Sequence, residues 1–312
     1  MKKDTQMLVV AGPTATGKTA LGIALARALG GEIVSADSMQ IYRRMDIGTA
    51  KATAGEQSLA VHHMIDVCEP GENYSVSRYV DEASRVCDRL IAEGKLPIVV
   101  GGTGLYIDSL LSGRDFAGRQ EEDESLRERL NAEYDRLGGE AMRRRLAAFD
   151  PERAEKLHPG DRRRIVRAIE IYELTGKTIT QHDRETRLLP PRYRAEKLCL
   201  SFRDREWLYE RIDRRVDRMV AQGLFDEVEA LLREGLSPDC TAMQAIGYKE
   251  AALALRGELS RQEAADLIKQ SSRRYAKRQL TWFKRDPQAR WFLWDREPDI
   301  QGAVETIVKN EE

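Results

Sequence analysis

The sequence is short of the residues that stabilise small secreted proteins and β-sandwiches. Aromatic side chains make up 6% of its 312 residues, while alanine, leucine, arginine and glutamate are abundant. This balance favours a helix-rich α/β protein. The cysteines are far apart in the sequence, so they form neither a CxxC redox pair nor a CxxC zinc knuckle. We expect the four of them to be reduced and mostly buried: Cys68, Cys87, Cys199 and Cys240.

Net charge and long hydrophobic runs are also lacking. Because 51 lysines and arginines face 52 acidic residues, a polyanionic partner has to be held by a local basic patch. The apolar run at residues 7–11 is cut off by Gly12-Pro13 and is too short for the core of a signal peptide. No stretch approaches the length of a membrane-spanning helix. We therefore expect a cytoplasmic protein that does not enter a membrane.

Short β-branched runs alternate with helical patterns in the first third of the chain. Strands are predicted over residues 6–11, 32–36 and 96–100, with a weaker candidate at 64–67. The apolar spacing between them predicts helices over 18–29 and 76–92. This alternation predicts an α/β fold in which a parallel sheet has helices on both faces. Such sheets bind ligands beyond the carboxyl ends of their strands.

The pattern changes at about residue 114. Residues 113–118 are loop-like, and the helices that follow, without an intervening strand, are predicted at 121–137, 139–148, 151–157 and 161–175. We interpret residues 115–195 as a helical insertion domain and residues 1–114 and 196–312 as the core. Beyond the insertion we expect a strand at 197–202 and a long helix or helix pair at 205–235. The chain is then expected to be helical to about residue 285 and to end in a short strand at 291–294.

The sharpest motif is a complete G-x-x-x-x-G-K-T between the first strand and the first helix. Glycines let backbone amides approach phosphate oxygens, the lysine adds a charge, and the threonine hydroxyl can hold Mg²⁺. The motif is typical of proteins that bind ATP or other nucleotides, and it predicts a di- or triphosphate site without identifying what the phosphates are attached to. Its residues are Gly12, Pro13, Thr14, Ala15, Thr16, Gly17, Lys18 and Thr19.

Two further strands end in polar residues. Asp37 follows the second strand, where its carboxylate can accept a proton or coordinate Mg²⁺ through water, or simply cap the next turn. The strand at 96–100 ends in Gly-Gly-Thr instead of the acidic residue that ATP hydrolysis requires. Thr103 offers a hydroxyl that can orient a ligand or a nucleophile, although a plain strand-to-helix turn is also possible.

Basic residues are clustered despite the neutral total. Residues 269–285 carry seven lysines and arginines, no acidic residue and three aromatic residues, a combination that suits single-stranded nucleic acid. A second cluster lies at 162–167 in the insertion. Three arginines share one face of a later helix, and they are either surface charges or include one that reaches a pyrophosphate: Arg211, Arg215 and Arg218.

Together these segments resemble the bacterial tRNA dimethylallyltransferase (tRNA isopentenyltransferase) family nearly end to end. The resemblance is carried by GPTATGKT at 12–19, SADSMQIYRRMDIGTAK at 35–51, PIVVGGTGLYIDSLL at 97–111, LHPGDRRRIVRAIEIYELTGKT at 157–178, AIGYKE at 245–250 and AKRQLTWFKR at 276–285.

This resemblance implies transfer of a dimethylallyl group from dimethylallyl pyrophosphate to N6 of the adenosine 3′-adjacent to the anticodon of tRNA. Pyrophosphate is then the leaving group, so Lys18 and Mg²⁺ on Thr19 would stabilise its developing charge. Asp37 would act as general base, Thr103 would orient the acceptor, and Arg215 would be a further pyrophosphate ligand. We expect a monomer.

The resemblance also implies tRNA contacts from five parts of the chain. They are Asp37, Ser38, Met39 and Gln40; Thr103; Arg127; Arg163, Arg164, Ile165, Val166 and Arg167; and, in the last third, Gln244, Ala245, Ile246, Gly247, Tyr248, Lys249, Lys277, Arg278, Gln279, Leu280, Thr281, Trp282, Phe283 and Lys284.

Three other functions use parts of the same pattern. A small-molecule kinase would bind ATP at the P-loop. An adenylate isopentenyltransferase would prenylate free AMP, but a mononucleotide needs neither the helical insertion nor the basic and aromatic stretch at 269–285. A non-catalytic tRNA-binding protein has no structural need for Lys18, Asp37 and Thr103 together.

Overall fold

The computed structural model describes residues 4–112 and 124–309. The chain divides into two compact units, one formed by Met1–Leu111 with Tyr193–Glu312 and the other by Ser112–Arg192. These boundaries fall close to those expected from the sequence. The loop expected at 113–118 and the first residues of the helix expected at 121–137 lie outside the described residues.

The first unit is built on a six-stranded sheet with the order β3-β2-β4-β1-β5-β6, in which every neighbouring pair is parallel. Every residue of β1 and β4 is buried. This agrees with their sequences, which are runs of apolar residues without alternating polar positions. The strands are β1 (Met7–Ala11), β2 (Glu32–Ser35), β3 (His62–His63), β4 (Pro97–Gly101), β5 (Ala195–Phe202) and β6 (Arg290–Trp294).

The prediction of a strand at residues 64–67 is wrong. Met64 and Asp66 have φ angles of 61° and 54°, a left-handed conformation that turns the chain away from the sheet. The strand is instead the two-residue β3, where Ile33 and Val34 pair with His62 and His63.

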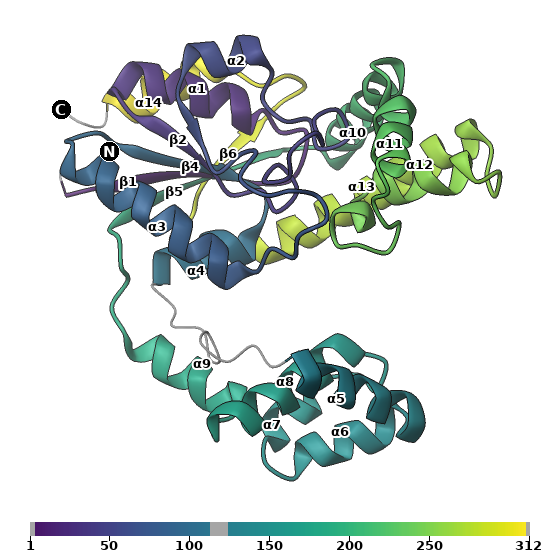
Figure 1. The fold of residues 1–312 in the computed structure, drawn as a ribbon. Coiled ribbons are helices and arrows are strands. Elements are labelled where there is room, and N and C mark those ends of the chain that lie inside the picture. The colour runs from purple at the N-terminus through teal and green to yellow at the C-terminus, as the bar shows by residue number, and fades with distance from the viewer. Residues whose placement is uncertain (1–3, 113–123, 310–312) are drawn as a thin grey trace. The chain divides into compact units, whose positions relative to one another are not determined.

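Helices cover both faces of the sheet, as the sequence predicts. Figure 1 shows α1 and α14 on one face and α3 and α4 on the other. The helix expected over 205–235 is a pair, broken where Gly223 adopts a φ of 101°. Helices of this unit are α1 (Lys18–Leu29), α2 (Ala54–Leu59), α3 (Val76–Ala92), α4 (Gly104–Ser112), α10 (Arg205–Ala221), α11 (Leu224–Arg233), η1 (Ala242–Gln244), α12 (Tyr248–Leu255), α13 (Arg261–Phe283) and α14 (Ile300–Val308).

The main core lies between the sheet and α1. Leu8, Val10, Ile98 and Val100 of the central strands pack with Leu21 and other α1 residues, all nearly inaccessible to solvent. Burying each such side chain contributes roughly 1.5–3 kcal/mol. This packing fixes where the loops at the carboxyl ends of the strands begin. Three cysteines are buried, the fourth is partly exposed, and all four are free thiols.

The second unit consists of α5 (Glu124–Leu137), α6 (Gly139–Ala147), α7 (Pro151–Glu155), α8 (Arg162–Thr175) and α9 (Ile179–Leu188). It has its own apolar core around Leu130, Leu146, Ile165 and Ile169. No strand occurs among its described residues, in agreement with a helical insertion.

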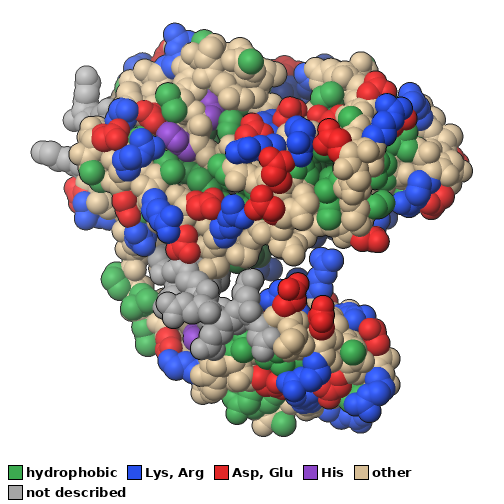
Figure 2. Space-filling view, viewed as in Figure 1, with side chains coloured by type: hydrophobic (Ala, Val, Ile, Leu, Met, Phe, Trp, Pro, Cys, Tyr) green, Lys and Arg blue, Asp and Glu red, His purple; other side chains and the backbone are tan. Residues whose placement is uncertain are grey.

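The surface carries both signs of charge. Figure 2 shows basic and acidic side chains interspersed on the visible face of each unit, as the near-zero net charge leads us to expect. Among the described residues, no helix is long and apolar enough to cross a membrane.

Candidate active site at the carboxyl edge of the sheet

The P-loop adopts a backbone that depends on two of its glycines. Gly12 has a φ of 138°, and a Cβ added there would lie 2.4 Å from the carbonyl oxygen of Leu200. Gly17, with a φ of 87°, caps the start of α1. Within the loop, Thr16 Oγ1 and Lys18 Nζ donate to the Pro13 carbonyl at 2.9 and 2.7 Å. The loop is therefore closed on itself, with its amides gathered at the amino end of a helix.

Residues distant in sequence hold the P-loop in place. The Gln279 side chain of α13 accepts from Thr14 N at 3.0 Å and donates to the Gly102 carbonyl at 2.9 Å, so it joins the P-loop to the end of β4. Trp294 Nε1 donates to the Thr16 carbonyl at 2.9 Å. From the sequence, Gln279 was expected to contact tRNA and Trp294 to be part of a strand, and neither was expected to support the P-loop.

Two cavities meet at the P-loop. The first has a volume of about 320 Å³ and reaches from the P-loop to α10 and α13, and the second, of about 800 Å³, extends toward α2. Both are lined by Lys18, Thr19, Ala50, Arg215 and Met219, so these five residues mark their junction.

The two cavities differ in chemistry. Besides the shared Lys18 and Arg215, the first contains Asp37 and Arg278 among apolar and neutral polar side chains that include Ile212, Val216 and Tyr275. The second gathers the cationic side chains of Lys18, Lys51, Arg211, Arg215 and Arg218, together with three carboxylates. An anion near the junction would therefore have a cluster of cations on one side and, on the other, a pocket that contains the Asp37 carboxylate and fewer cations.

Two cations at the junction are poorly solvated. Burial, helped by the positive charge of Arg215 and opposed by Asp37, lowers the pKa of Lys18 to about 7. Burial also lowers the pKa of Arg215, and the Asp37 carboxylate again opposes the shift. A polyanion placed between these side chains would relieve their repulsion and hold the proton on Lys18, which is the electrostatic signature of an anion site.

Asp37 lies at the sheet edge and also organises its own loop. Its Oδ1 accepts from the amides of Met39 at 2.9 Å and Gln40 at 3.4 Å, the capping contact that its position after β2 suggests. The carboxylate nevertheless lines the first cavity. Capping and proton acceptance are compatible, since these two amides occupy one of its two oxygens.

Thr103 supports this loop from the neighbouring strand end. Its hydroxyl accepts from Ser38 N at 3.1 Å and donates to Ser38 Oγ at 3.3 Å. Tyr275 also hydrogen-bonds with Thr103; burial raises the pKa of Tyr275 to about 12, and this bond partly opposes the shift. Thr103 thus contacts the loop that carries Asp37, whereas Tyr275 contributes directly to the cavity lining.

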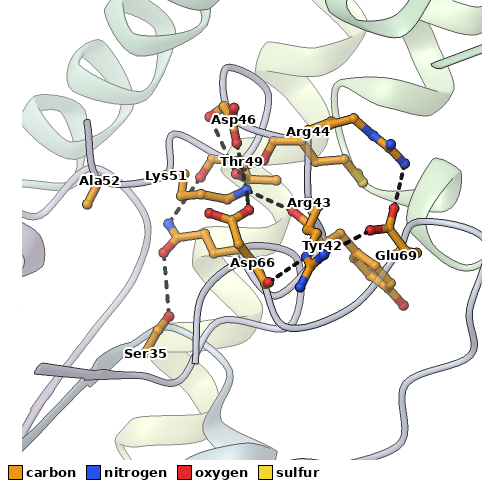
Figure 3. A network of polar contacts seen from close by, with 12 residues as sticks. Ser35, Tyr42, Arg43, Arg44, Asp46, Thr49, Lys51, Ala52, Asp66 and Glu69 are labelled. Atoms are coloured by element: carbon orange, nitrogen blue, oxygen red, sulfur yellow. Dashed lines mark hydrogen bonds and ion pairs between the residues drawn. The ribbon is translucent and has the colours of Figure 1, made fainter. Parts of the chain in front are cut away.

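The loop at residues 45–51 lines both cavities, a role that the sequence did not predict. Lys51 is buried, and its Nζ donates to the Tyr42 carbonyl at 2.7 Å and to Asp46 and Asp66 at 2.6 Å each (Figure 3). A buried ammonium with three acceptors is fully satisfied, so it fixes the loop between residues 42 and 51.

The amide of Gln40 supports the same loop from the other side. Its Nε2 donates to the carbonyls of Thr49 at 3.3 Å and Ala50 at 3.2 Å. The Thr49 carbonyl also accepts from the Arg215 guanidinium at 3.4 Å. Gln40, expected to contact tRNA, is therefore also part of the scaffold that holds Arg215.

Most of the predicted tRNA-contacting residues fall into three groups. Those that line the first cavity are Asp37, Ser38, Met39, Gln40, Gln244, Ala245, Ile246, Arg278 and Gln279. Those with exposed side chains elsewhere are Arg163, Arg164, Lys249, Lys277, Thr281 and Lys284. Those with buried side chains are Ile165, Val166, Tyr248 and Phe283, which contribute to cores and not to a surface.

Two predicted residues of the insertion unit share a buried partner. Glu170 is fully buried, and its carboxylate accepts from Arg127 Nε at 3.0 Å and from Arg167 at 2.8 Å. Both arginines remain partly exposed, so each has donors left for another anion.

Trp282 connects elements of the first unit. Its indole N–H donates to Asp108 at 2.7 Å, and a Cβ on Gly104 would lie 2.3 Å from its ring. Lys197 completes the cluster through ion pairs with Asp108 at 3.1 Å and Asp286 at 2.7 Å. The ring therefore holds α13 against α4.

Comparison with known proteins agrees with this geometry. The sequence matches the family described as IPP transferase over residues 40–286, and that described as Isopentenyl transferase over residues 5–66. It is 44% identical over 308 residues to the tRNA dimethylallyltransferase of Thermoanaerobacter sp. (strain X514), covering 97% of this chain and 96% of that relative. The chain belongs to the tRNA dimethylallyltransferase family.

Other members and solved structures are similar along nearly the whole chain. The tRNA dimethylallyltransferase 1 of Pelobacter propionicus is 48% identical over 286 residues, 92% of each protein. The crystal structure of the tRNA isopentenylpyrophosphate transferase from Bacillus halodurans has a TM-score of 0.72 at 40% identity, covering 98% of this chain and 96% of that one. A eukaryotic dimethylallyltransferase acting on tRNA has a TM-score of 0.83 at 28% identity, covering 98% and 80%.

Proposed function

We propose that this member of the family transfers the dimethylallyl group of dimethylallyl pyrophosphate to N6 of the adenosine 3′-adjacent to the anticodon of tRNA. One observation carries the proposal. A cation-lined cavity and a cavity containing Asp37 meet at Lys18, Thr19 and Arg215. This arrangement suits a reaction in which an anion leaves on one side and a neutral amine attacks from the other.

The chain's own residues account for each part of the reaction. The bond between the allylic carbon and the pyrophosphate oxygen breaks, and Lys18, Arg215 and the P-loop amides stabilise the charge that develops. The N6 nitrogen forms the new carbon–nitrogen bond and loses a proton, which Asp37 accepts. The products are N6-(dimethylallyl)adenosine, pyrophosphate and the protonated carboxyl of Asp37.

Mg²⁺ at this site would take few of its ligands from the protein. Thr19 lines both cavities, and no group of three or more histidine, cysteine, aspartate or glutamate side chains that could hold a metal exists in the described chain. Mg²⁺ commonly takes one or two protein oxygens and completes its shell with phosphate and water. Thr19 would hold the ion beside the pyrophosphate, where it would add positive charge to the leaving group.

The acceptor side is large enough for a base drawn out of a stacked loop. Tyr275 offers a ring, and Gln244, whose Nε2 also donates to the Pro238 carbonyl at 2.9 Å, offers an amide that can read a purine edge. The exposed basic residues of α13 and α8 then follow the tRNA backbone. A monomer in the cytoplasm stays a prediction.

The deciding experiment supplies purified protein, Mg²⁺ and labelled dimethylallyl pyrophosphate with unmodified tRNA, with AMP, or with no acceptor. We expect label in tRNA alone, at the adenosine next to the anticodon after nuclease digestion. Label in AMP instead would show an adenylate isopentenyltransferase. Phosphorylated product from ATP and a nucleotide, without prenylation, would show a kinase.

A further inference from the structure

Glu227 of α11 binds backbone amides of the loop at residues 45–51, which lines both cavities. Its Oε2 accepts from the amides of Asp46 at 2.9 Å and Ile47 at 2.8 Å, and its Oε1 accepts from Gly48 N at 3.1 Å. Three consecutive amides therefore converge on one carboxylate, an arrangement that normally binds an anion and is here filled by the protein's own side chain.

Tyr248 of α12 completes the arrangement. Its hydroxyl donates to Glu227 Oε1, and burial together with this carboxylate raises the pKa of Tyr248 well above its usual value. A Cβ on Gly48 would lie 2.4 Å from the Tyr248 ring, so the loop backbone lies directly against that ring. The loop cannot shift toward α12, and the carboxylate prevents it from moving away.

The next residues of the loop carry the contact to Arg215. Gly48, Thr49 and Ala50 line the first cavity, and the Thr49 carbonyl accepts from the Arg215 guanidinium at 3.4 Å. A displaced amide at Gly48 would therefore displace the carbonyl that orients this guanidinium.

We propose that Glu227, supported by Tyr248, is a positioning residue that fixes residues 46–50 and through them directs Arg215 at the leaving pyrophosphate. The inference rests on the proposed role of Arg215 as a pyrophosphate ligand. Glu227 itself lines neither cavity. The Glu227 carboxylate can accept hydrogen bonds from all three amides. A glutamine side chain at this position would place its N–H donors against at least one of these N–H groups.

The test is a double-mutant cycle with E227Q, R215A and the double variant. We expect E227Q to lower the single-turnover prenylation rate by about tenfold or more, since small misplacements of a catalytic group have effects of this size. In the R215A background, E227Q should lower this rate by less than about twofold, because the guanidinium that Glu227 positions is absent. Affinity for tRNA should stay within about twofold of wild type.

Binding of inorganic pyrophosphate with Mg²⁺, measured by calorimetry, gives a readout that does not depend on prenyl transfer. E227Q should weaken this binding about tenfold when Arg215 is present and hardly at all when it is absent. A chain that binds pyrophosphate in this pattern but prenylates no tRNA would leave the inference standing and refute the proposed function.

Equal losses from E227Q in both backgrounds would overturn the proposal, as would a loss of tRNA affinity as large as the loss of rate. E229Q is the matched control, because Glu229 lies on the same helix, is partly exposed and pairs only with Arg233 among the contacts described. If E227Q does not fold, Y248F removes a single donor to Glu227 and should show a smaller loss with the same dependence on Arg215.

Discussion

Asp37 has a structural role in its own loop and a chemical role in the cavity. One oxygen caps the turn after β2, while the carboxylate also lines the cavity and lowers the electrostatic cost of Lys18 and Arg215. Asparagine keeps an acceptor oxygen for the Met39 and Gln40 amides but cannot accept the amine proton. Structure and chemistry can therefore be separated at this position.

We expect Asp37→Asn to bind tRNA normally and to slow alkylation by about a hundredfold, within the range typical of a general base. Filter binding and single-turnover kinetics measure the two quantities. A fall in tRNA affinity equal to the fall in rate would show that Asp37 recognises tRNA and does not act as the base.

Lys18→Ala removes a cation from the junction of the cavities, where burial and Arg215 already make charge costly. We expect turnover to fall by about a hundredfold or more, as for loss of a typical transition-state donor. The control is Lys95→Ala, which removes an exposed lysine paired with Glu32 and should retain activity. A loss below about threefold at saturating donor would contradict the role of Lys18.

Among the elements, α13 contributes to the site in three ways. It carries Gln279, which bridges the P-loop and the end of β4, Tyr275, which lines the first cavity, and Trp282, which holds the helix against α4. The basic residues that made this stretch conspicuous in the sequence lie largely on its exposed side. The helix thus supports the P-loop with one face and offers charge with the other.

Gln279→Ala should leave the Thr14 amide and the Gly102 carbonyl without their partner. Leaving a buried polar group unsatisfied costs about 1–3 kcal/mol, so we expect a lower free energy of unfolding together with weaker pyrophosphate binding. Denaturant titration and calorimetry measure both effects. Gln262→Ala on the exposed face of the same helix should change neither, and equal effects of the two substitutions would refute the bridging role.

At the scale of the whole molecule, two separately packed units divide the work. The first contains both cavities and the P-loop, and the second presents arginines on a small helical core of its own. In the second unit Arg163 and Arg164 are exposed, while Arg127 and Arg167 are tied to Glu170. The exposed pair is therefore the better test of electrostatic contact with tRNA.

Replacing Arg163 and Arg164 together by alanine should weaken tRNA binding and flatten its salt dependence. Each lost phosphate contact removes roughly 0.7 to 0.9 from the slope of log affinity against log salt. Pyrophosphate binding should not change, because that ligand is expected in the other unit. Arg233→Ala, which removes an exposed arginine of α11, is the control. An unchanged slope in the double variant would refute the contact.

The sequence by itself determined the features that depend on neighbours along the chain. The P-loop with its flanking strand and helix, the helical insertion and the reduced cysteines all follow from local spacing and composition. The two-residue β3 and the short helices α2 and α14 were not predicted, because their signal is too short to stand out from loops.

Only the tertiary structure decided which side chains complete the site. Gln279 reaches Thr14 across 265 positions of the chain, and Glu227 reaches Gly48 across 179. No local periodicity encodes such pairs, because hydrogen bonds between distant segments form only after strands and helices have packed. The cavities exist for the same reason: Asp37 and Lys18 follow β2 and β1, which β4 separates in the sheet, whereas Arg215 and Tyr275 come from helices that the fold brings to that edge.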